Sequence, residues 1–251
     1  MKKLLFVVFL MFSQSLLAYS DLGHKMVAAA AWQNLTPFAK QSVERLLGVG
    51  EQKFIEASVW ADRIKSNEAF NYLKPLHYVN MPKMATKYDK ARDCKRNKCV
   101  VEAIKDFSQI AKTGSEKERT LALRMLIHLI ADVHQPLHAG LFEDRGGNWY
   151  EIKYQGKSVT LHKFWDNQIV KRFDNDVISG ANKINANGIS VDVSNPVAWA
   201  EESHAIAVNS VYLAPENKTL TDDYLLMADN ITQTQLSRAS WRLAMWLNTL
   251  W

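Results

Sequence analysis

Histidine and aspartate recur with the same spacing in two segments of the chain. His128 precedes Asp132 by four residues, and His162 precedes Asp166 by the same interval. On a helix, residues four apart lie on one face, so an imidazole and a carboxylate at this spacing can reach the same ion. One such pair is also the pattern of a structural hydrogen bond, but two pairs among only seven histidines favour a metal site. Imidazole nitrogen and carboxylate oxygen are both typical zinc ligands.

The residues around the first pair indicate how further ligands are brought in. Pro136 disfavours helical conformation at Gln135, so the helix that carries His128 should end near His134. His138 then lies on a turn and can fold back towards the same ion. His134 is about 240° from His128 around an ideal helix, so it should face away and be either structural or a partner of a ligand residue. The other candidate ligands are Asp62, His77 and His24.

Helical periodicity predicts the elements that hold these residues. Apolar residues recur at helical spacing through most of the chain, and Thr36 before Pro37 is typical of a helix start. Two short strands, Trp149–Tyr154 and Ser158–Leu161, are predicted to form a hairpin. The chain has no repeat and no linker, so we expect one all-α domain of mostly long helices at residues 19–251. The helices are predicted at His24–Gln33, Pro37–Leu47, Phe54–Lys65, Val100–Lys112, Glu116–His134, His162–Phe173, Pro196–Tyr212 and Thr221–Leu250.

The composition is that of a folded protein. Hydrophobic residues make up 47% of the 251 residues and charged residues 23%, which excludes an extended disordered chain. Ten glycines and six prolines are too few for a collagen-like or turn-dense all-β protein. The formal net charge of +5 is small, so charge gives only weak support for a polyanionic partner.

The first 18 residues have the pattern of a secretory signal peptide. Lys2 and Lys3 precede an apolar run, Leu4–Phe12, that is too short to span a bilayer. The stretch that follows ends in the small residue Ala18, which predicts cleavage there and a mature chain that begins at Tyr19. We therefore expect a secreted or periplasmic protein. No later apolar run approaches the ~20 residues of a transmembrane helix.

Export to an oxidising compartment would also account for the two cysteines. Cys94 and Cys99 flank four residues, and a disulfide between them would close a small loop. A zinc-binding thiol pair is the alternative interpretation. The chain has no second pair of thiols to complete such a site, so the disulfide is preferred.

Six short motifs, taken in order, make the chain resemble a known family. Its members are the secreted single-strand-specific zinc nucleases and 3'-nucleotidases of the S1/P1 type, and the motifs cover nearly the whole predicted mature chain. Each motif alone is weak, but the ordered set is highly specific. Zinc-dependent phospholipases C are similar in fold and metal cluster. The motifs are Leu22-Gly23-His24, Trp60-Ala61-Asp62, Leu76-His77-Tyr78-Val79-Asn80, His128-x3-Asp132-x5-His138, Arg145-Gly146-Gly147-Asn148 and Leu161-His162-x3-Asp166.

The resemblance implies three zinc ions in an all-α fold. The implied ligands of the first ion are Asp62, His77, His128 and Asp132. Those of the second ion are His138, His162 and Asp166. Those of the third ion are His24, a bridging Asp132, and the α-amino nitrogen and carbonyl oxygen of Tyr19. That amine exists only after cleavage, so removal of the signal peptide would complete the site.

The implied activity is hydrolysis of single-stranded DNA and RNA by a zinc-activated water, with 5'-phosphate products. Removal of phosphate from 3'-mononucleotides is implied as well, and we expect a monomer. Two alternatives stay open at this point, a phospholipase C of the same fold and a non-catalytic zinc-binding protein. The segment Arg145-Gly146-Gly147-Asn148 and the short chain favour the nuclease.

Four residues near the ligands are expected to handle the substrate. Lys65 stands where the fungal pattern has an arginine that clamps phosphate, and lysine can act there only as a point charge. Asn80 replaces an aspartate that would orient the water, and asparagine cannot act as a base. Tyr78 is placed to stack on a nucleobase, and Asn148 follows two glycines that would let backbone approach the base. The alternatives are ordinary packing for Tyr78 and a solvated helix residue for Lys65.

Overall fold

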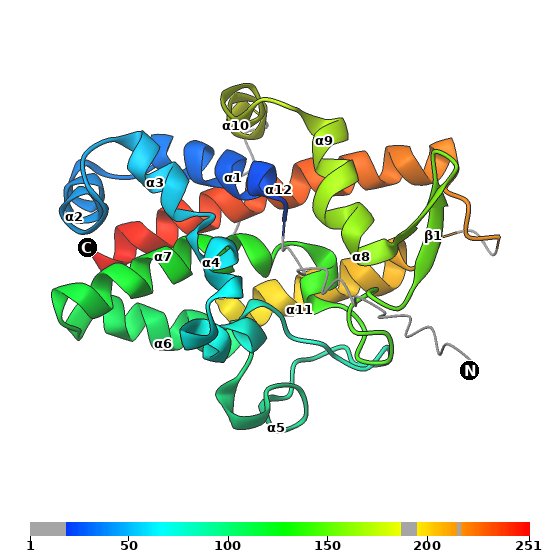
Figure 1. The fold of residues 1–251 in the computed structure, drawn as a ribbon, viewed down its shortest axis with the longest axis horizontal. Coiled ribbons are helices and arrows are strands. Elements are labelled where there is room, and N and C mark those ends of the chain that lie inside the picture. Colours follow the sequence, from blue (N-terminus) through cyan, green and yellow to red (C-terminus); the bar gives the residue numbers. More distant parts are fainter. Residues whose placement is uncertain (1–18, 187–194, 215–216) are drawn as a thin grey trace, which may run out of the picture.

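The computed structural model describes residues 19–186, 195–214 and 217–251, so the predicted signal peptide at residues 1–18 lies outside the described residues. Helices make up most of the described chain, and its one sheet has two strands, which confirms the predicted all-α fold with a small hairpin (Figure 1). The α-helices are α1 (Asp21–Gln33), α2 (Pro37–Leu47), α3 (Glu51–Ala57), α4 (Trp60–Arg63), α5 (Lys90–Asp93), α6 (Val100–Thr113), α7 (Glu116–Asp132), α8 (Leu161–Lys163), α9 (Ile169–Phe173), α10 (Val177–Ala186), α11 (Pro196–Ile206) and α12 (Asp222–Leu250). Short 3-10 segments are η1 (Ile64–Ser66), η2 (Glu68–His77), η3 (Lys95–Asn97) and η4 (Pro136–Ala139), and π-helical segments are η5 (Phe164–Gln168) and η6 (Ala207–Val211).

Helix α1 packs tightly against α10 and α12 in the interior. The four alanines from Ala28 to Ala31 are completely buried, and their small side chains allow the neighbouring helices to come close. Helix α10, which was not predicted, approaches through Gly180, where a Cβ would lie 2.6 Å from Met26 Sδ. Glycine weakens the helical signal of this segment but is required by the contact. In Figure 1, α1 (blue) lies beside α12, which runs along the length of the molecule from orange to red.

Helices α6 and α7 form a hairpin around Gly114 and Ser115, and α7 also packs against α2 and α12. From Met125 to Asp132 every residue of α7 is buried, because neighbouring elements cover all sides of its second half. The helix ends at Asp132, two residues before the predicted end. Polar residues in this half of α7 therefore need partners inside the protein.

The single helix predicted at Phe54–Lys65 is wrong. Helix α3 ends at Ala57 and α4 begins at Trp60, so the chain is interrupted around Ser58. The hydroxyl of Ser58 donates a hydrogen bond to the carbonyl oxygen of Ile55 at 2.6 Å, a local bond that competes with the helical ladder. The interruption leaves the carbonyl of Ser58 available for a side chain on α7.

The hairpin is found close to the predicted position. Strands β1 (Glu151–Tyr154) and β2 (Lys157–Thr160) pair antiparallel, with Glu151 opposite Thr160. Thr160 then caps α8, because its hydroxyl accepts a hydrogen bond from the backbone N–H of Lys163 at 3.2 Å. None of the helices in the described residues has the length and apolar character needed to cross a membrane.

Candidate metal centre

Helix α7 carries two candidate ligands on its buried face. His128 and Asp132 are completely buried, and His128 Nε2 lies 3.2 Å from Asp132 Oδ2. The other ring nitrogen, His128 Nδ1, donates to the carbonyl oxygen of Ser58 at 2.7 Å, at the interruption between α3 and α4. This bond orients the ring so that Nε2 faces the carboxylate. The helical spacing therefore brings this pair together, as predicted.

Asp132 is the residue at which most of the candidate ligands meet. Its Oδ2 lies 3.0 Å from His77 Nδ1, at the end of η2. Its Oδ1 lies 3.3 Å from His24 Nε2, on α1, and 3.6 Å from His138 Nδ1. The ring of His24 also stacks on that of His128 with 3.9 Å between centroids. This central position agrees with the bridging role that the resemblance implied for Asp132.

Helix α4 brings Asp62, and the segment η1 that follows it brings Lys65, to the same cluster. Asp62 Oδ1 lies 3.6 Å from His128 Nε2, and the Asp62 side chain is almost completely buried. Lys65 follows three residues later and forms an ion pair with Asp62 through Nζ. The Lys65 side chain is only 15% exposed, so it is not a solvated helix residue.

A second group consists of His138, His162 and Asp166. His162 Nε2 lies 3.2 Å from Asp166 Oδ2, and His138 Nε2 lies 3.8 Å from Asp166 Oδ1. Asp166 lies on the π-helical segment η5, a type of helix distortion that is frequent at functional sites. All three side chains are buried, and the structure brings them together as the sequence predicted.

Backbone carbonyls orient both imidazoles of this second group. His138 Nδ1 donates to the carbonyl of His77, and His162 Nδ1 donates to the carbonyl of Gly146, each at 2.7 Å. Gly146 has a φ of +64°, and a Cβ there would lie 2.5 Å from the carbonyl oxygen of Leu137. The glycine that was expected to approach a nucleobase thus has a second role, which is to hold His162 in place.

The start of the described chain lies against both groups. Tyr19 is 1% exposed, and its ring meets the ring of His24 edge-on with 6.2 Å between centroids. The backbone N–H of Ser20 donates to the carbonyl oxygen of Asp166 at 2.8 Å. Tyr19 is therefore placed beside His24, the candidate ligand with which the resemblance pairs it.

Burial and neighbouring charges set the protonation of the cluster. Burial lowers the pKa of His77, His138 and His162 to about 4 each, so these imidazoles are neutral at pH 7. Burial alone would raise the pKa of Asp132, but the adjacent histidines, His128 first, hold it well below its ordinary value. Burial raises the pKa of Asp166 well above that of an ordinary carboxyl group. Neutral imidazoles and ionised carboxylates are the forms that bind metal ions, so His77, His138, His162 and Asp132 are in that form, whereas Asp166 would lose a proton on binding a metal ion.

Several buried polar atoms of the cluster have no hydrogen-bond partner among the described residues. They include both ring nitrogens of His24, Asp132 Oδ1 and His138 Nε2. Although His24 Nε2 and Asp132 Oδ1 lie 3.3 Å apart, the contact lacks hydrogen-bond geometry. Buried atoms of this kind are costly unless they bind something. The candidate ligand atoms form three groups, and the atoms inside each group lie within 4.8 Å of one another, so these residues fit bound metal ions. The groups are His24 with Asp62 and His128, His77 with His128 and Asp132, and His138 with His162 and Asp166.

Gln135 is a residue of the site that the sequence analysis missed. Its Nε2 donates to Asp166 Oδ1 at 2.6 Å, while its Oε1 accepts from the backbone N–H of Leu137 at 2.6 Å. Both ends of the amide are therefore fixed, and the completely buried glutamine holds the Asp166 carboxylate in one orientation. Its position directly before Pro136 was the available signal, but that signal was interpreted only as the end of a helix.

Replacing Gln135 with leucine, which has a similar volume, should weaken metal binding at the group of His138, His162 and Asp166. Loss of a residue that orients a ligand typically costs about 10–100-fold in metal affinity. Titration with a competing chelator would measure the change. Replacing Gln233, a half-buried glutamine on α12, with leucine provides the control. Equal affinities for both variants and the unaltered protein would contradict this role.

The segment that carries Tyr78 and Asn80 runs parallel to the segment after η4. The backbone N–H of Val79 donates to the carbonyl of His138 at 2.8 Å, and Met81 forms a bridge with Leu141. Tyr78 is 42% exposed and directly follows the candidate ligand His77. Asn80 is half-buried and lies close to Gly146. A Cβ atom added to Gly146 would lie 3.2 Å from Asn80 Oδ1. Both residues therefore lie next to the cluster.

Asn148 has a local partner in the structure. Its Nδ2 donates to the carbonyl oxygen of Arg145 at 2.8 Å, within the turn that contains both glycines. Arg145 in turn lies over the ring of Trp149, with 4.4 Å to the centroid. The side-chain oxygen of Asn148 is not engaged in that bond, and the residue is half-buried.

His134 and His204 do not belong to the cluster. His134 Nδ1 donates to the carbonyl of Ile130 at 2.6 Å, and its Nε2 faces Arg242 Nη1 at 2.9 Å. This confirms that it points away from His128. His204 Nδ1 donates to the carbonyl of Ala139 at 2.7 Å, which gives it a structural role.

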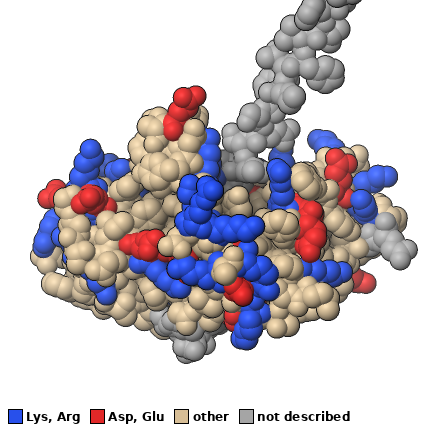
Figure 2. All heavy atoms as spheres, turned by 90° about the horizontal axis from the view of Figure 1, so that it is seen from below, with Lys and Arg blue, Asp and Glu red and all other residues tan. Residues whose placement is uncertain are grey.

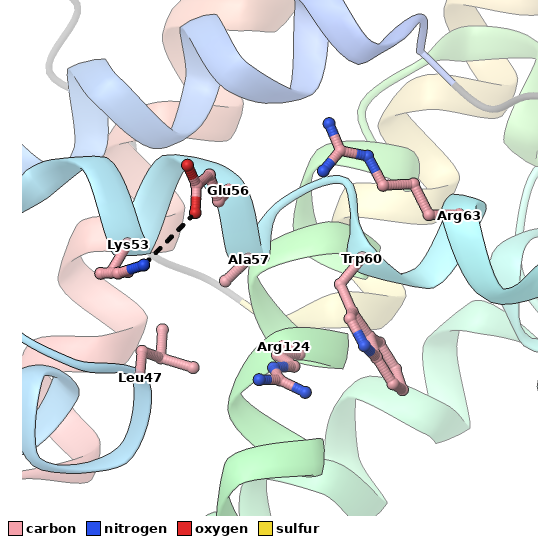
Figure 3. A pocket seen from close by; sticks show the side chains of 7 residues that line it. All are labelled: Leu47, Lys53, Glu56, Ala57, Trp60, Arg63 and Arg124. Carbon is pink, nitrogen blue, oxygen red and sulfur yellow. Dashed lines mark ion pairs between the residues drawn. The ribbon is translucent and has the colours of Figure 1, made fainter.

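The disulfide and one surface cavity complete the surroundings. Cys94 and Cys99 form the predicted disulfide. A cavity of about 260 Å³ lies between α3, α4 and α7, and Trp60 and Arg124 lie against it (Figure 3). Trp60 is two residues from Asp62, so it lies on the opposite side of α4 from the cluster. None of the candidate ligands lines this cavity.

Comparisons with known proteins agree with the site. The family model described as S1/P1 nuclease matches residues 19–251. Endonuclease 4 of Arabidopsis thaliana is 28% identical over 93% of this chain and 89% of that protein, and Endonuclease 5 of the same plant is 30% identical over 76% and 75%. Nuclease S1 of Aspergillus oryzae is 26% identical over 92% of this chain and 91% of that protein. The resemblance is confirmed, and the chain belongs to the S1/P1 nuclease family, whose members are hydrolases of phosphodiester bonds.

Proposed function

We propose that this protein is a zinc-dependent nuclease that cleaves single-stranded DNA and RNA to 5'-phosphate products and removes the phosphate from 3'-mononucleotides. The observation that carries the proposal is the buried cluster around Asp132, where imidazole nitrogens and carboxylate oxygens meet without enough hydrogen-bond partners. A mixed set of imidazole and carboxylate ligands suits zinc better than magnesium or calcium, which prefer oxygen alone.

Three zinc ions are proposed, as the family resemblance implies. Their ligands would be Asp62, His77, His128 and Asp132 for the first, His138, His162 and Asp166 for the second, and His24, Asp132 and the backbone of Tyr19 for the third. When bound, zinc lowers the pKa of water and neutralises charge on phosphoryl oxygens. The amine of Tyr19 requires a cut after Ala18, so we also propose that residues 1–18 are a signal peptide and that the protein is secreted or periplasmic. A monomer would suffice for this arrangement.

Lys65 and Asn80 would act on the phosphate and on water. The Lys65 ammonium pairs with Asp62 at the edge of the cluster, so a substrate phosphate bound there would meet a positive charge. The amide of Asn80 can donate and accept hydrogen bonds but cannot remove a proton. We therefore assign Asn80 to orienting the reacting groups and Lys65 to binding phosphate as a point charge.

Tyr78 would bind the nucleobase next to the scissile bond. Two hydrogen bonds fix the backbone at Tyr78. The carbonyl of Tyr78 accepts from the backbone N–H of Val100 at 3.1 Å, and the backbone N–H of Val79 donates to the carbonyl of His138. The ring of Tyr78 remains exposed beside the cluster. Stacking on an aromatic ring requires an unpaired base, which supports preference for single strands. The side-chain oxygen of Asn148 would accept a hydrogen bond from a base edge.

Replacing Tyr78 with alanine should lower kcat/KM on single-stranded oligonucleotides about 5- to 150-fold, because stacking contributes ~1–3 kcal/mol per base. Replacement with phenylalanine should change it less than about twofold, since the ring is retained. Cleavage at an abasic position should be affected by neither substitution. The matched control is Tyr72→Ala, which removes a different exposed tyrosine; Tyr72 lies on η2. Unchanged kcat/KM for Tyr78→Ala would contradict the stacking role.

The proposed activity is tested with the protein purified after export. Its zinc content, its N-terminal residue and its hydrolysis of single-stranded DNA, RNA and phosphatidylcholine would be measured together. About three zinc ions per chain, an N-terminal Tyr19 and chelator-sensitive cleavage of nucleic acid are expected. Cleavage of the lipid without cleavage of nucleic acid would refute the proposal.

A further inference from the structure

The disulfide loop between Cys94 and Cys99 concentrates positive charge on the surface. The loop encloses four residues, the 3-10 turn η3 followed by Lys98, and three of these four residues are cations. Lys95, Arg96 and Lys98 are all exposed and form no ion pair within the described residues. The loop itself contains no acidic residue.

Most of the basic residues around the loop pair with acidic residues. Lys90 and Lys105 both pair with Glu102 at 2.8 Å. Arg92 pairs with Asp93, and Lys87 pairs with Glu201. Figure 2 shows Lys and Arg side chains gathered in the middle of the face that carries α5. The uncompensated part of this positive region therefore includes the three cations of the loop.

The loop is attached directly to the proposed base-stacking residue. Val100, which follows Cys99, donates its N–H to the carbonyl of Tyr78 at 3.1 Å. Lys98 is two residues from Val100, so its Cα lies within roughly 10 Å of the Tyr78 backbone. That distance is short on the scale of an extended nucleic-acid strand. A strand held at Tyr78 could thus reach the loop with its next phosphates.

The loop is held in one conformation. The disulfide closes it, and Arg96 and Asn97 adopt left-handed φ values of 60° and 56°. Such values are uncommon for residues other than glycine and persist where the surroundings impose them. Cations presented by a fixed loop lose little conformational freedom of the backbone on binding.

We propose that the loop Cys94–Cys99 binds the phosphate backbone of a single-stranded nucleic acid that extends beyond the base at Tyr78. The inference rests on the proposed function and adds to it a second contact that only long substrates can make. A nucleic-acid strand is favoured over an anionic membrane because Lys95-Arg96-Asn97-Lys98 contains no apolar side chain to enter a lipid surface. The bound groups are phosphates, so the contact should be independent of sequence and sensitive to salt.

The test removes the three charges and keeps the fold. The variant Lys95→Gln, Arg96→Asn, Lys98→Gln retains the disulfide and places asparagine, which tolerates left-handed φ, at position 96. A charge-conserving variant, Lys95→Arg, Arg96→Lys, Lys98→Arg, shows whether charge alone matters. The matched control, Arg45→Gln, Lys112→Gln, Lys117→Gln, removes three exposed cations from α2 and from both sides of the α6–α7 turn. Binding of a fluorescent 20-nucleotide single strand with phosphorothioate linkages, which resist hydrolysis, would be measured by anisotropy from 50 to 200 mM salt. In parallel, kcat/KM would be measured with a 3'-mononucleotide.

Neutralising the loop should reduce the slope of log affinity against log salt by about 2, because each phosphate contact in a single strand contributes about 0.7. The loss of affinity between 50 and 200 mM salt should then be about 15-fold smaller than in the unaltered protein. The charge-conserving variant and the control should keep the original slope, and kcat/KM for the mononucleotide should stay within about twofold.

Three outcomes would overturn the inference: an unchanged slope, an equal decrease in the control, or loop-dependent binding to phosphatidylserine vesicles with unchanged binding to the oligonucleotide. Failure of the proposed function is a separate result. If the unaltered protein cleaves no nucleic acid, the proposed function is refuted, and the anisotropy measurement still decides whether the loop binds the strand.

Discussion

Replacing Asp132 with asparagine should reduce hydrolysis of single-stranded DNA by at least about 1,000-fold and lower the metal content of the protein. Asp132 contacts His24, His77 and His128 within 3.3 Å, so its loss affects more than one group of ligands. Asparagine has the same shape but no charge, and it turns an N–H2 donor towards atoms that should bind a cation. Bound metal supplies several kcal/mol of transition-state stabilisation, and 1.36 kcal/mol corresponds to a factor of ten in rate.

A matched substitution distinguishes this effect from the loss of an ordinary ion pair. Asp229→Asn removes the carboxylate that pairs with Arg172 at 2.8 Å on the surface, and it should leave rate and metal content unchanged. Metal content would be measured by elemental analysis on the same samples as the rate. An Asp132→Asn protein with full metal content and near-normal rate would refute the central role of this residue.

Removing the metal ions with a chelator should abolish activity and lower Tm by about 10 °C. Ions bound only by the folded state stabilise it by about 4 kcal/mol at 1,000 times Kd, and 1 kcal/mol shifts Tm by about 2–4 °C in a chain of this size. Without the ions, the buried carboxylates of Asp62, Asp132 and Asp166 lose their proposed partners. Calorimetry with and without chelator would measure the shift. Zinc should restore both activity and Tm, and magnesium should restore neither.

The chelated protein should also become less stable in mild acid. The pKa of His77, His138 and His162 is about 4 in the folded protein, below the ordinary value of about 6.5 expected after unfolding. Between these values the unfolded state binds more protons at these three residues, so their contribution to stability falls as pH decreases from about 6.5 towards 4. A Tm of the chelated protein that is constant across this interval, or a chelator that leaves Tm unchanged at neutral pH, would contradict a buried metal centre.

The two pairs on helices could be predicted from residue spacing alone. His128 with Asp132 and His162 with Asp166 meet because residues four apart share a helical face, whatever the rest of the fold does. His24 and His77 are different, since they reach Asp132 from distant elements. Spacing contains no information about that approach, and only the order of the family motifs indicated it.

The groups that orient the ligands could not be predicted, because most of them are backbone atoms. The carbonyls of Ser58, His77 and Gly146 each accept from a ring Nδ1 at 2.7 Å, and any residue type provides a carbonyl. The same gap explains the error in the helix predicted at Phe54–Lys65. Apolar periodicity continues across the interruption, while the side chain that binds the exposed carbonyl of Ser58, His128 on α7, lies 70 residues away in the sequence.

The stacked rings of His24 and His128 join parts of the chain that are made far apart in time. These residues are separated by 104 positions, and the last proposed side-chain ligand, Asp166, is 142 positions after the first. Contacts between distant positions form late, since the entropy of closing long loops must be overcome first. A nascent chain would therefore emerge with only single imidazoles and isolated pairs, too few ligands for tight capture of an ion. Metal uptake is accordingly expected to report the completion of folding rather than to initiate it.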